Sequence, residues 1–312
     1  MRILEHIVNE NEQGQTLRAL VPKVFRLSSH AFRRLKVQNG IRVNGEARHV
    51  SCQVNAGDSV TVHLLSESIS PEPDAEPGHA QQTVQHSGLI LYLDEDLLIA
   101  DKPAPLPTLP GRYTGITLRE LLAEALSLDP DAAYHPVNRL DKGTSGLLCI
   151  ARHDHAQHLL TQSLHTGAFI REYLAVTEGI PSPPASVIRL PIARAGSGAR
   201  RVISPEGKPS VTRYEVLYAE AESARALVRL NLETGRTHQI RVHLAAIGCP
   251  IVGDYLYGQE HPDLRDRFAL HSAHLRCRQP VTGAVIDLTA PFPDALAALF
   301  HSPDAARAAV RF

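Results

Sequence analysis

An acidic residue stands between a turn-forming segment and an apolar run near the middle of this chain. Asp141 is followed by Gly-Thr-Ser-Gly at residues 143–146 and then by Leu-Leu-Cys-Ile-Ala at residues 147–151. The first segment is typical of a turn, and the second has the length and apolarity of a buried strand. An acid in this place lies at the floor of a cleft. It either accepts backbone hydrogen bonds within the turn or carries chemistry, and two later segments favour chemistry.

Residues 138–146, Asn-Arg-Leu-Asp-Lys-Gly-Thr-Ser-Gly, resemble the motif of the RluA family of pseudouridine synthases. That motif reads His-Arg-Leu-Asp, two variable residues, then Thr-Ser-Gly. Asn138 stands in place of the histidine, and asparagine keeps a hydrogen-bonding side chain but cannot titrate. The resemblance implies that Asp141 is the catalytic aspartate. It also implies that Arg139 corresponds to the arginine that fills the stack vacated by an extruded uridine.

Two later segments carry the same resemblance. Arg171, Tyr173 and Ala175 match a family pattern of a basic residue, Tyr and Ala at alternate positions, with Arg where Lys is common. Arg241 follows Gln-Ile within residues 232–244, as the family arginine does. The likeness implies that Tyr173 stacks on the target base and that Arg241 lies against the aspartate. A buried carboxylate stays ionised only beside a cation or several donors, which explains why the family needs that arginine.

The family's reaction converts uridine within RNA into pseudouridine. The base leaves its N-glycosidic bond, rotates and returns through carbon, without redox change or an added group, so we expect no cofactor. Asp141 either attacks the anomeric carbon or removes a proton from the ribose 2′ position, and both routes remain open. Tyr173 is a candidate for assisting loss of the C5 proton.

Basic residues are concentrated near the N-terminus, although the whole chain has a net charge of only −1. Residues 13–50 hold eight Lys or Arg against the single acid Glu46, a net charge of +7, so the remainder carries −8. Thr16 and Ser28 or Ser29 are expected to begin two short helices, followed by a small sheet. This plan resembles the α-L RNA-binding module of a small-subunit ribosomal protein. The side chains expected to reach RNA phosphates are Lys23, Arg26, Arg33, Arg34 and Lys36.

The chain has 312 residues, 43% of them hydrophobic, which is enough for one large domain and one small domain. We expect an RNA-binding domain over residues 1–65, a flexible acidic linker over 66–87 and a catalytic domain over 88–312. By the resemblance, the catalytic domain is α+β, with a mixed, mainly antiparallel sheet and a cleft across it (the pseudouridine synthase fold). Lys102-Pro103 also resembles the family. A capping box at residues 117–120 predicts a helix through Leu126, and residues 239–246 are expected to be helical.

Three histidines, His153, His155 and His158, suggest a metal site on a helix. We reject that interpretation because no further ligand with matching spacing follows, and we expect these histidines to be solvated on a polar helix face. The four cysteines show neither zinc-type spacing nor a disulfide framework, which favours reduced thiols in a cytoplasmic protein. No apolar run has the length of a signal peptide or a membrane span.

We therefore expect a monomeric enzyme whose partner is RNA. Ribosomal RNA of the large subunit is the first candidate and transfer RNA the second, and no membrane is involved. A rival interpretation is a non-catalytic RNA-binding or ribosome-assembly factor on a synthase-like scaffold, which retention of Asp141, Tyr173 and Arg241 disfavours. A metal-dependent hydrolase that uses the three histidines is a third interpretation, and it predicts inhibition by chelators.

Overall fold

The computed structural model describes residues 2–64, 88–110, 115–128, 134–164 and 166–312. The expected linker at 66–87 lies outside the described residues, so the bounds of the two domains and the linker stay a prediction. Within the described residues, the N-terminal part has a hydrophobic core of its own, separate from the two clusters of the larger part. No helix of the described residues is long and apolar enough to cross a membrane.

The N-terminal part consists of a helix pair packed on a small antiparallel sheet of order β1-β4-β2-β3. Leu17, Leu20 and Val21 of the first helix and Leu35 of the second are buried against the sheet. Both expected helices are present, whereas the first strand was not predicted. The elements of the N-terminal part are β1 (Arg2–Ile7), η1 (Glu10–Glu12), α1 (Leu17–Val24), α2 (Ser29–Val37), β2 (Ile41–Val43), β3 (Glu46–Ala47) and β4 (Ser59–Leu64).

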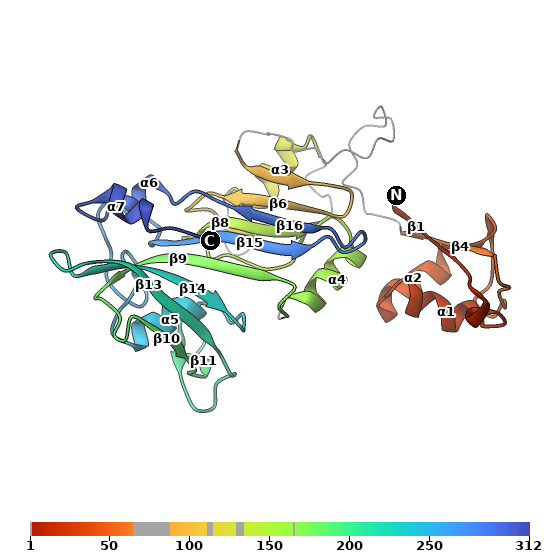
Figure 1. The fold of residues 1–312 in the computed structure, drawn as a ribbon, viewed down its shortest axis with the longest axis horizontal. Helices are drawn as coiled ribbons and strands as arrows, with labels where there is room; N and C mark the ends of the chain where they lie inside the picture. The colour runs from red at the N-terminus through yellow and green to blue at the C-terminus, as the bar shows by residue number, and fades with distance from the viewer. Residues whose placement is uncertain (1, 65–87, 111–114, 129–133, 165) are drawn as a thin grey trace.

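The described residues of the larger part form one ten-stranded sheet (Figure 1). Eight of its strands follow the order β10-β13-β14-β9-β15-β8-β6-β5, while β16 pairs with β15 and β7 pairs with β8. Every pair is antiparallel except β8 with β15. The expected α+β fold with a mixed, mainly antiparallel sheet is therefore confirmed. The strands are β5 (Ile90–Leu93), β6 (Leu97–Lys102), β7 (His135–Pro136), β8 (Ser145–Ala151), β9 (Ile170–Glu178), β10 (Ala185–Ile188), β13 (Thr212–Glu220), β14 (Arg225–Leu232), β15 (Leu270–Arg278) and β16 (Val285–Thr289).

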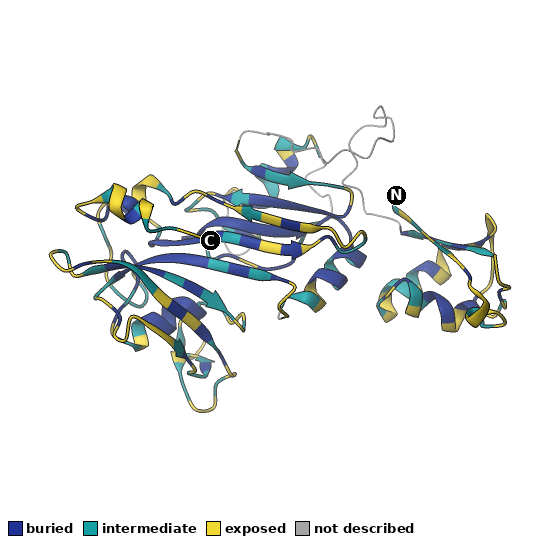
Figure 2. Ribbon diagram, in the orientation of Figure 1, coloured by how far each residue is buried: buried dark blue, intermediate teal, exposed yellow. Residues whose placement is uncertain are grey.

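Both faces of the central strands are buried (Figure 2). Alternate residues of β8 enter different apolar clusters, because Leu148 and Ile150 join one cluster while Leu147 and Cys149 join the other. Successive side chains of a strand point to opposite faces, so this division shows that helices or loops cover each face. The described residues of the larger part also form five helices and a hairpin: α3 (Leu118–Ala125), α4 (Asp154–Ser163), α5 (Gln239–Ala246), α6 (Asp294–Ala297), α7 (Pro303–Ala308), and β11 (Ile192–Arg194) with β12 (Arg201–Ile203).

The expectation that the three histidines are solvated was wrong for His153 and His155, whereas His158 is partly exposed. His153 is buried and caps the helix, its Nδ1 accepting from the backbone N–H of Ala156 at 3.2 Å, while its Nε2 lies 2.9 Å from Asp96. His155 is buried too, and burial lowers its pKa to about 4. The sequence pattern could not show this, because Asp96 comes from a distant turn. Among the described residues, no group of three His, Cys, Asp or Glu could hold a metal ion.

Candidate active site

Asp141 lies in the turn that joins β7 to β8, at the sheet's parallel strand pair. The backbone N–H of Thr144 donates to the carbonyl of Asp141 at 3.0 Å and closes the turn. Thr108 fixes the preceding residue, because its hydroxyl donates to the carbonyl of Leu140 at 2.8 Å. The side chain of Asp141 remains 28% exposed in this rigid frame, so its carboxylate is available to a substrate.

The two glycines of the turn are required by close contacts. A Cβ on Gly143 would lie 2.6 Å from the ring of Phe268, and a Cβ on Gly146 would lie 2.2 Å from the carbonyl oxygen of Ser272. Gly146 also has a φ of +103°, which side-chain-bearing residues rarely adopt. Residues 143–146 were predicted as turn formers. The structure adds that β15 and Phe268 press directly against the turn that carries Asp141.

Arg241, on α5, forms an ion pair with Asp141. Its Nη1 donates to Oδ2 of Asp141 at 3.1 Å, while Nε and Nη2 donate to the two oxygens of Asp254 at 2.7 Å each. The guanidinium carbon lies 4.1 Å from the ring centre of Phe268 and 5.1 Å from that of Tyr257. Arg241 and Asp254 are both buried, so the bidentate pair fixes the cation in place. Asp141 therefore has a buried, fixed cation as a hydrogen-bond partner.

Gln239 anchors the helix that presents Arg241. Its side-chain oxygen accepts from the hydroxyl of Thr234 at 2.8 Å and from the backbone N–H of Arg236 at 3.0 Å. Its amide nitrogen donates to the carbonyl of Val211 and the hydroxyl of Thr212, both at 3.0 Å. This buried amide therefore has four partners and ties the start of α5 to β13 and β14.

Lys102, at the end of β6, is a buried cation beneath the same turn. Its ammonium donates to the carbonyls of Pro103 at 3.0 Å, Leu106 at 2.7 Å and Lys142 at 3.4 Å. Burial lowers the pKa of Lys102 to about 7, although the charge of Asp141 acts in the opposite direction. These three bonds hold the residue next to Asp141 against the loop after β6. Lys102-Pro103 was noted in the sequence as family-like, and its position explains why lysine is needed there.

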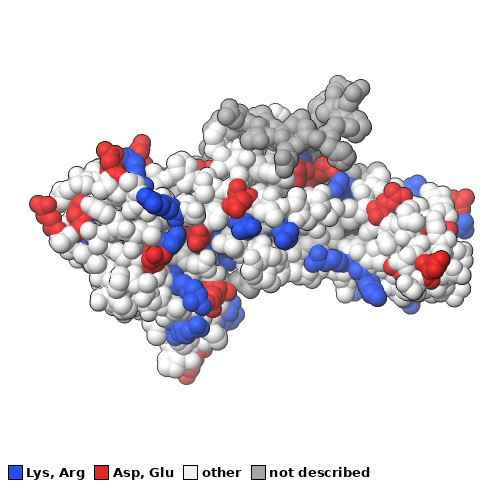
Figure 3. Space-filling view, viewed as in Figure 1, with Lys and Arg blue, Asp and Glu red and all other residues white. Residues whose placement is uncertain are grey.

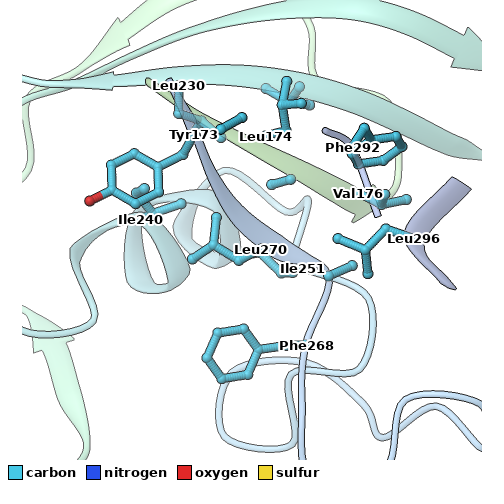
Figure 4. Close-up of a cluster of buried hydrophobic side chains, with 14 of the residues drawn as sticks. Tyr173, Leu174, Val176, Leu230, Ile240, Ile251, Phe268, Leu270, Phe292 and Leu296 are labelled. Carbon is cyan, nitrogen blue, oxygen red and sulfur yellow. The ribbon is translucent and has the colours of Figure 1, made fainter. Parts of the chain in front are cut away.

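Tyr173, on β9, is only 4% exposed and packs against Leu230, Ile240 and Leu270 in the larger apolar cluster (Figure 4). The close-up shows its hydroxyl directed away from that cluster. Burial raises the pKa of this hydroxyl, so at neutral pH it is a neutral phenol. The ring forms part of the wall of the pocket that contains Asp141.

One pocket brings the predicted site residues together. Arg139 stands at this pocket with its side chain exposed, whereas Asn138 is buried and does not line it. The Oδ1 atom of Asn138 instead accepts from the backbone N–H of Cys149 at 3.4 Å, behind the turn. The pocket is lined by Arg139, Leu140, Asp141, Thr144, Tyr173, Leu232, Arg236, His238, Gln239, Ile240, Arg241 and Leu270.

Comparison with known proteins identifies the family. Residues 96–246, which include Asp141, Tyr173 and Arg241, match the model for RNA pseudouridylate synthase. A Bacillus subtilis (strain 168) protein named Uncharacterized RNA pseudouridine synthase YhcT is 36% identical over 94% of this chain and 94% of its own length. The chain belongs to the RNA pseudouridylate synthase family. The expected RluA-type synthase and the expected enzyme class, an isomerase acting on uridines of RNA, are thereby confirmed.

One further relative and one solved structure are also similar to this pseudouridine synthase. The Ribosomal large subunit pseudouridine synthase D of Vibrio parahaemolyticus serotype O3:K6 is 34% identical over 95% of this chain and 93% of its own length. The solved structure of Human RNA Pseudouridylate Synthase Domain Containing 1 has a TM-score of 0.55 and 27% identity, covering 72% of this chain and 90% of that one. The sheet of the larger part is thus the one that pseudouridine synthases use.

The basic residues of the N-terminal part differ in their surroundings. Lys23, Arg26, Arg33 and Lys36 are exposed. Arg34 is half-buried, and its Nη1 lies 2.8 Å from Asp154 at the start of α4, so it joins the two parts of the synthase. Figure 3 shows Lys and Arg side chains on the face of the N-terminal part nearest the larger part, as well as over the region of β13 and β14. The contacts of these five side chains with RNA remain predictions, and so do the catalytic roles of the pocket residues.

Proposed function

We propose that this pseudouridine synthase isomerises specific uridines of large-subunit ribosomal RNA, with Asp141 as its catalytic aspartate. The observation that carries the proposal is the ion pair of Asp141 with the buried Arg241, at 3.1 Å, in a pocket walled by Tyr173. Relatives named for the large ribosomal subunit support the choice of RNA. Transfer RNA is the second candidate, and we propose a monomer that works in the cytoplasm.

The pocket suits a reaction on an extruded nucleotide. Taking a uridine out of a folded RNA costs a few kcal/mol, and Arg139 is exposed at the pocket, where it can fill the space that the base leaves. The uracil then lies against the ring of Tyr173, and the ribose faces Asp141. Arg241 holds one oxygen of Asp141, and the carboxylate then either attacks the anomeric carbon or takes the 2′ proton.

The residues of this chain supply all the groups that the proposed reaction uses. The uracil that leaves the sugar is the same group that returns through C5, so the atoms balance without a cofactor. Tyr173 is a neutral phenol, so its hydroxyl is proposed to relay the C5 proton to water after the new bond forms, accepting that proton as it gives up its own. The asparagine at position 138 removes no titratable group from the pocket, because its side chain lies behind the turn.

The alternative is an RNA-binding or ribosome-assembly factor without catalysis. The ion pair argues against it, since a scaffold has no need for a partly exposed aspartate beside a buried arginine that is held by a second aspartate. Buried ion pairs contribute little net stability, so the arrangement is better explained by chemistry.

Pseudouridine mapping of total RNA tests the proposal. Three strains are compared: one with the gene, one lacking it, and one expressing only Asp141→Asn. We expect specific large-subunit positions to lose pseudouridine equally in the last two strains, while the variant protein accumulates normally. Loss confined to transfer RNA would correct the substrate. Full modification in the Asp141→Asn strain would overturn the catalytic role, and identical maps in all three strains would overturn the proposed function.

A further inference from the structure

His238 is a second polar group, after Arg241, at the Asp141 carboxylate. It precedes α5, lines the pocket, and its Nε2 lies 4.0 Å from Oδ2 of Asp141. Its other ring nitrogen, Nδ1, lies 2.9 Å from the hydroxyl of Tyr257. Site geometry without substrate is often looser than in the bound state, so a small movement or one bridging water brings His238 into hydrogen-bonding distance of Asp141.

Tyr257 contacts both His238 and Arg241, the two side chains that face Asp141. Its ring stands edge-on to His238, with ring centres 5.7 Å apart, and the guanidinium carbon of Arg241 lies 5.1 Å from its centre. Its hydroxyl accepts the backbone N–H of Arg201, on β12, at 2.8 Å. The β11–β12 hairpin therefore supports Tyr257, and Tyr257 supports the imidazole.

The hydrogen bonds favour one position for the proton on the His238 ring. Burial lowers the pKa of His238, so the ring is neutral at pH 7 and holds one N–H. The hydroxyl of Tyr257 already accepts from Arg201, and its single proton is free to be donated to Nδ1. The remaining N–H is then on Nε2, the nitrogen that faces the acceptor oxygen of Asp141. The carboxylate of Asp141, 4.0 Å from Nε2, also favours a proton on that nitrogen, while Asp254, Arg241 and Arg201 are the other charged groups around the ring.

The backbone of His238 is unusual as well. It has φ 58° and ψ 19°, the left-handed region, which residues with a side chain rarely adopt. Such a conformation persists only where the surroundings impose it, and it is concentrated at functional sites. Asparagine adopts this region more readily than histidine does. A purely structural role would therefore be served better by asparagine at this position.

We propose that His238 is a positioning residue for Asp141 and that Tyr257 sets its tautomer; this inference rests on the proposed function. Arg241 and His238 both face Oδ2, and neither uses Oδ1. Together they fix the rotation of the carboxylate, so that Oδ1 is the oxygen presented to the ribose. The hairpin contributes through Tyr257, without touching Asp141 itself.

Two side-chain replacements at His238 separate positioning from structure. In His238→Gln the amide nitrogen reaches the place of Nε2, whereas in His238→Asn it reaches only that of Nδ1 while suiting the left-handed backbone better. We expect single-turnover rates at saturating RNA in the order wild type, Gln, Asn, with Asn about 10-fold or more below wild type and the more stable of the two variants. RNA affinity should change less than two-fold. An Asn variant as fast as or faster than Gln would overturn the proposal.

Tyr257→Phe removes only the hydroxyl, and Tyr255→Phe, at an exposed tyrosine of the same loop, is the matched control. The full chain labelled with ¹⁵N-histidine is compared by NMR, together with single-turnover rates on a large-subunit ribosomal RNA transcript. We expect the proton on Nε2 of His238 in wild type and Tyr255→Phe, and a mixture with a several-fold lower rate in Tyr257→Phe. A proton on Nδ1 in wild type, or a Tyr257→Phe rate equal to wild type, would overturn the proposal. A wild-type protein that forms no pseudouridine on any RNA would instead overturn the proposed function, and the tautomer still tests the positioning of His238.

Discussion

Two aspartates of this molecule, Asp141 and Asp96, each face an arginine and a histidine. Asp141 lies 3.1 Å from Arg241 and 4.0 Å from His238. Asp96 lies 3.2 Å from Arg2 and 2.9 Å from His153. The side chain of Asp141 is 28% exposed and that of Asp96 is 1% exposed. The same residue types therefore form a partly exposed site around Asp141 and a buried structural cluster around Asp96.

The difference lies in how fully the carboxylate is occupied. Asp96 accepts from Gln279 in addition to His153 and Arg2, and Arg2 comes from β1 of the N-terminal part. Burial raises the pKa of Asp96, but these hydrogen bonds and charges outweigh it and hold the pKa below its usual value. At Asp141, Arg241 and His238 both face Oδ2, so the other oxygen, Oδ1, stays available in the pocket. A buried charged cluster indicates chemistry only where it leaves an acceptor for a substrate.

Replacing Asp141 should have the largest effect on activity. Asp141→Asn preserves shape but removes the nucleophile or base, so turnover should fall at least about a thousand-fold. Stability should change little, because the side chain is partly exposed. Release of tritium from RNA labelled at uridine C5 measures turnover, and thermal unfolding measures stability. Residual turnover within ten-fold of wild type would break the distinction between the two aspartates.

Removing the second partner of Arg241 should damage stability and activity together. Asp254→Asn leaves a buried guanidinium with only Asp141, and breaking a buried pair costs roughly 3–5 kcal/mol. The unfolding midpoint in urea should fall, with an unchanged m-value. Asp263→Asn, at a side chain that is 83% exposed, is the control and should leave both quantities unchanged. A stable and fully active Asp254→Asn protein would contradict the arrangement described for Arg241.

The closed cluster should matter for stability alone. Asp96→Asn removes a buried charge that pairs with His153 and Arg2, at a cost of about 3 kcal/mol. Single-turnover rates measured well below the melting temperature should stay within about three-fold of wild type. Because the folded pKa of Asp96 is depressed, its contribution to stability is present above its unfolded pKa of 3.8 and is lost as the pH falls through the lower folded value. A folded but inactive variant would assign this cluster to catalysis.

His155, stacked 6.3 Å from His153 in the same cluster, should make the fold sensitive to acid. Burial lowers its pKa from 6.5 to about 4, so the unfolded chain binds the proton more readily. Stability is therefore lost as the pH falls from about 6.5 to about 4, by up to about 3 kcal/mol from this group. In His155→Gln, the free energy of unfolding measured in urea should depend less on pH across this range. An unchanged pH dependence would show that the imidazole titrates normally.

The smallest effects should come from the predicted RNA contacts. Arg33→Gln removes an exposed charge and should lower the slope of log affinity against log salt by about one unit. Arg34→Gln is the informative comparison, because that side chain is paired with Asp154 and should change the slope less. Binding of large-subunit ribosomal RNA across a salt series measures both. Equal slopes for wild type and both variants would show that α2 does not contact RNA.

Local sequence patterns were sufficient for most elements of the fold. The apolar run at 147–151 lies within β8, which is buried along its whole length, the capping box at Thr117 and Glu120 begins α3, and α5 has the expected bounds. Each of these depends on residues that are neighbours in sequence, so spacing reveals it. The alternating exposure of β1 gave no comparable signal, because no residue of that strand is fully buried.

The three family motifs identified Asp141, Tyr173 and Arg241 from sequence, and the structure brings all three to one pocket. The family resemblance also implied the pairing of Arg241 with Asp141, whereas tertiary structure alone decided the other pairs of charges. Asp141 and Arg241 are 100 residues apart, Asp96 and His153 are 57 apart, and Arg34 and Asp154 are 120 apart. Such pairs form only when the sheet brings distant turns together, and their energy depends on the burial that results. The same physics buried His153 and His155 against a pattern typical of an exposed helix face.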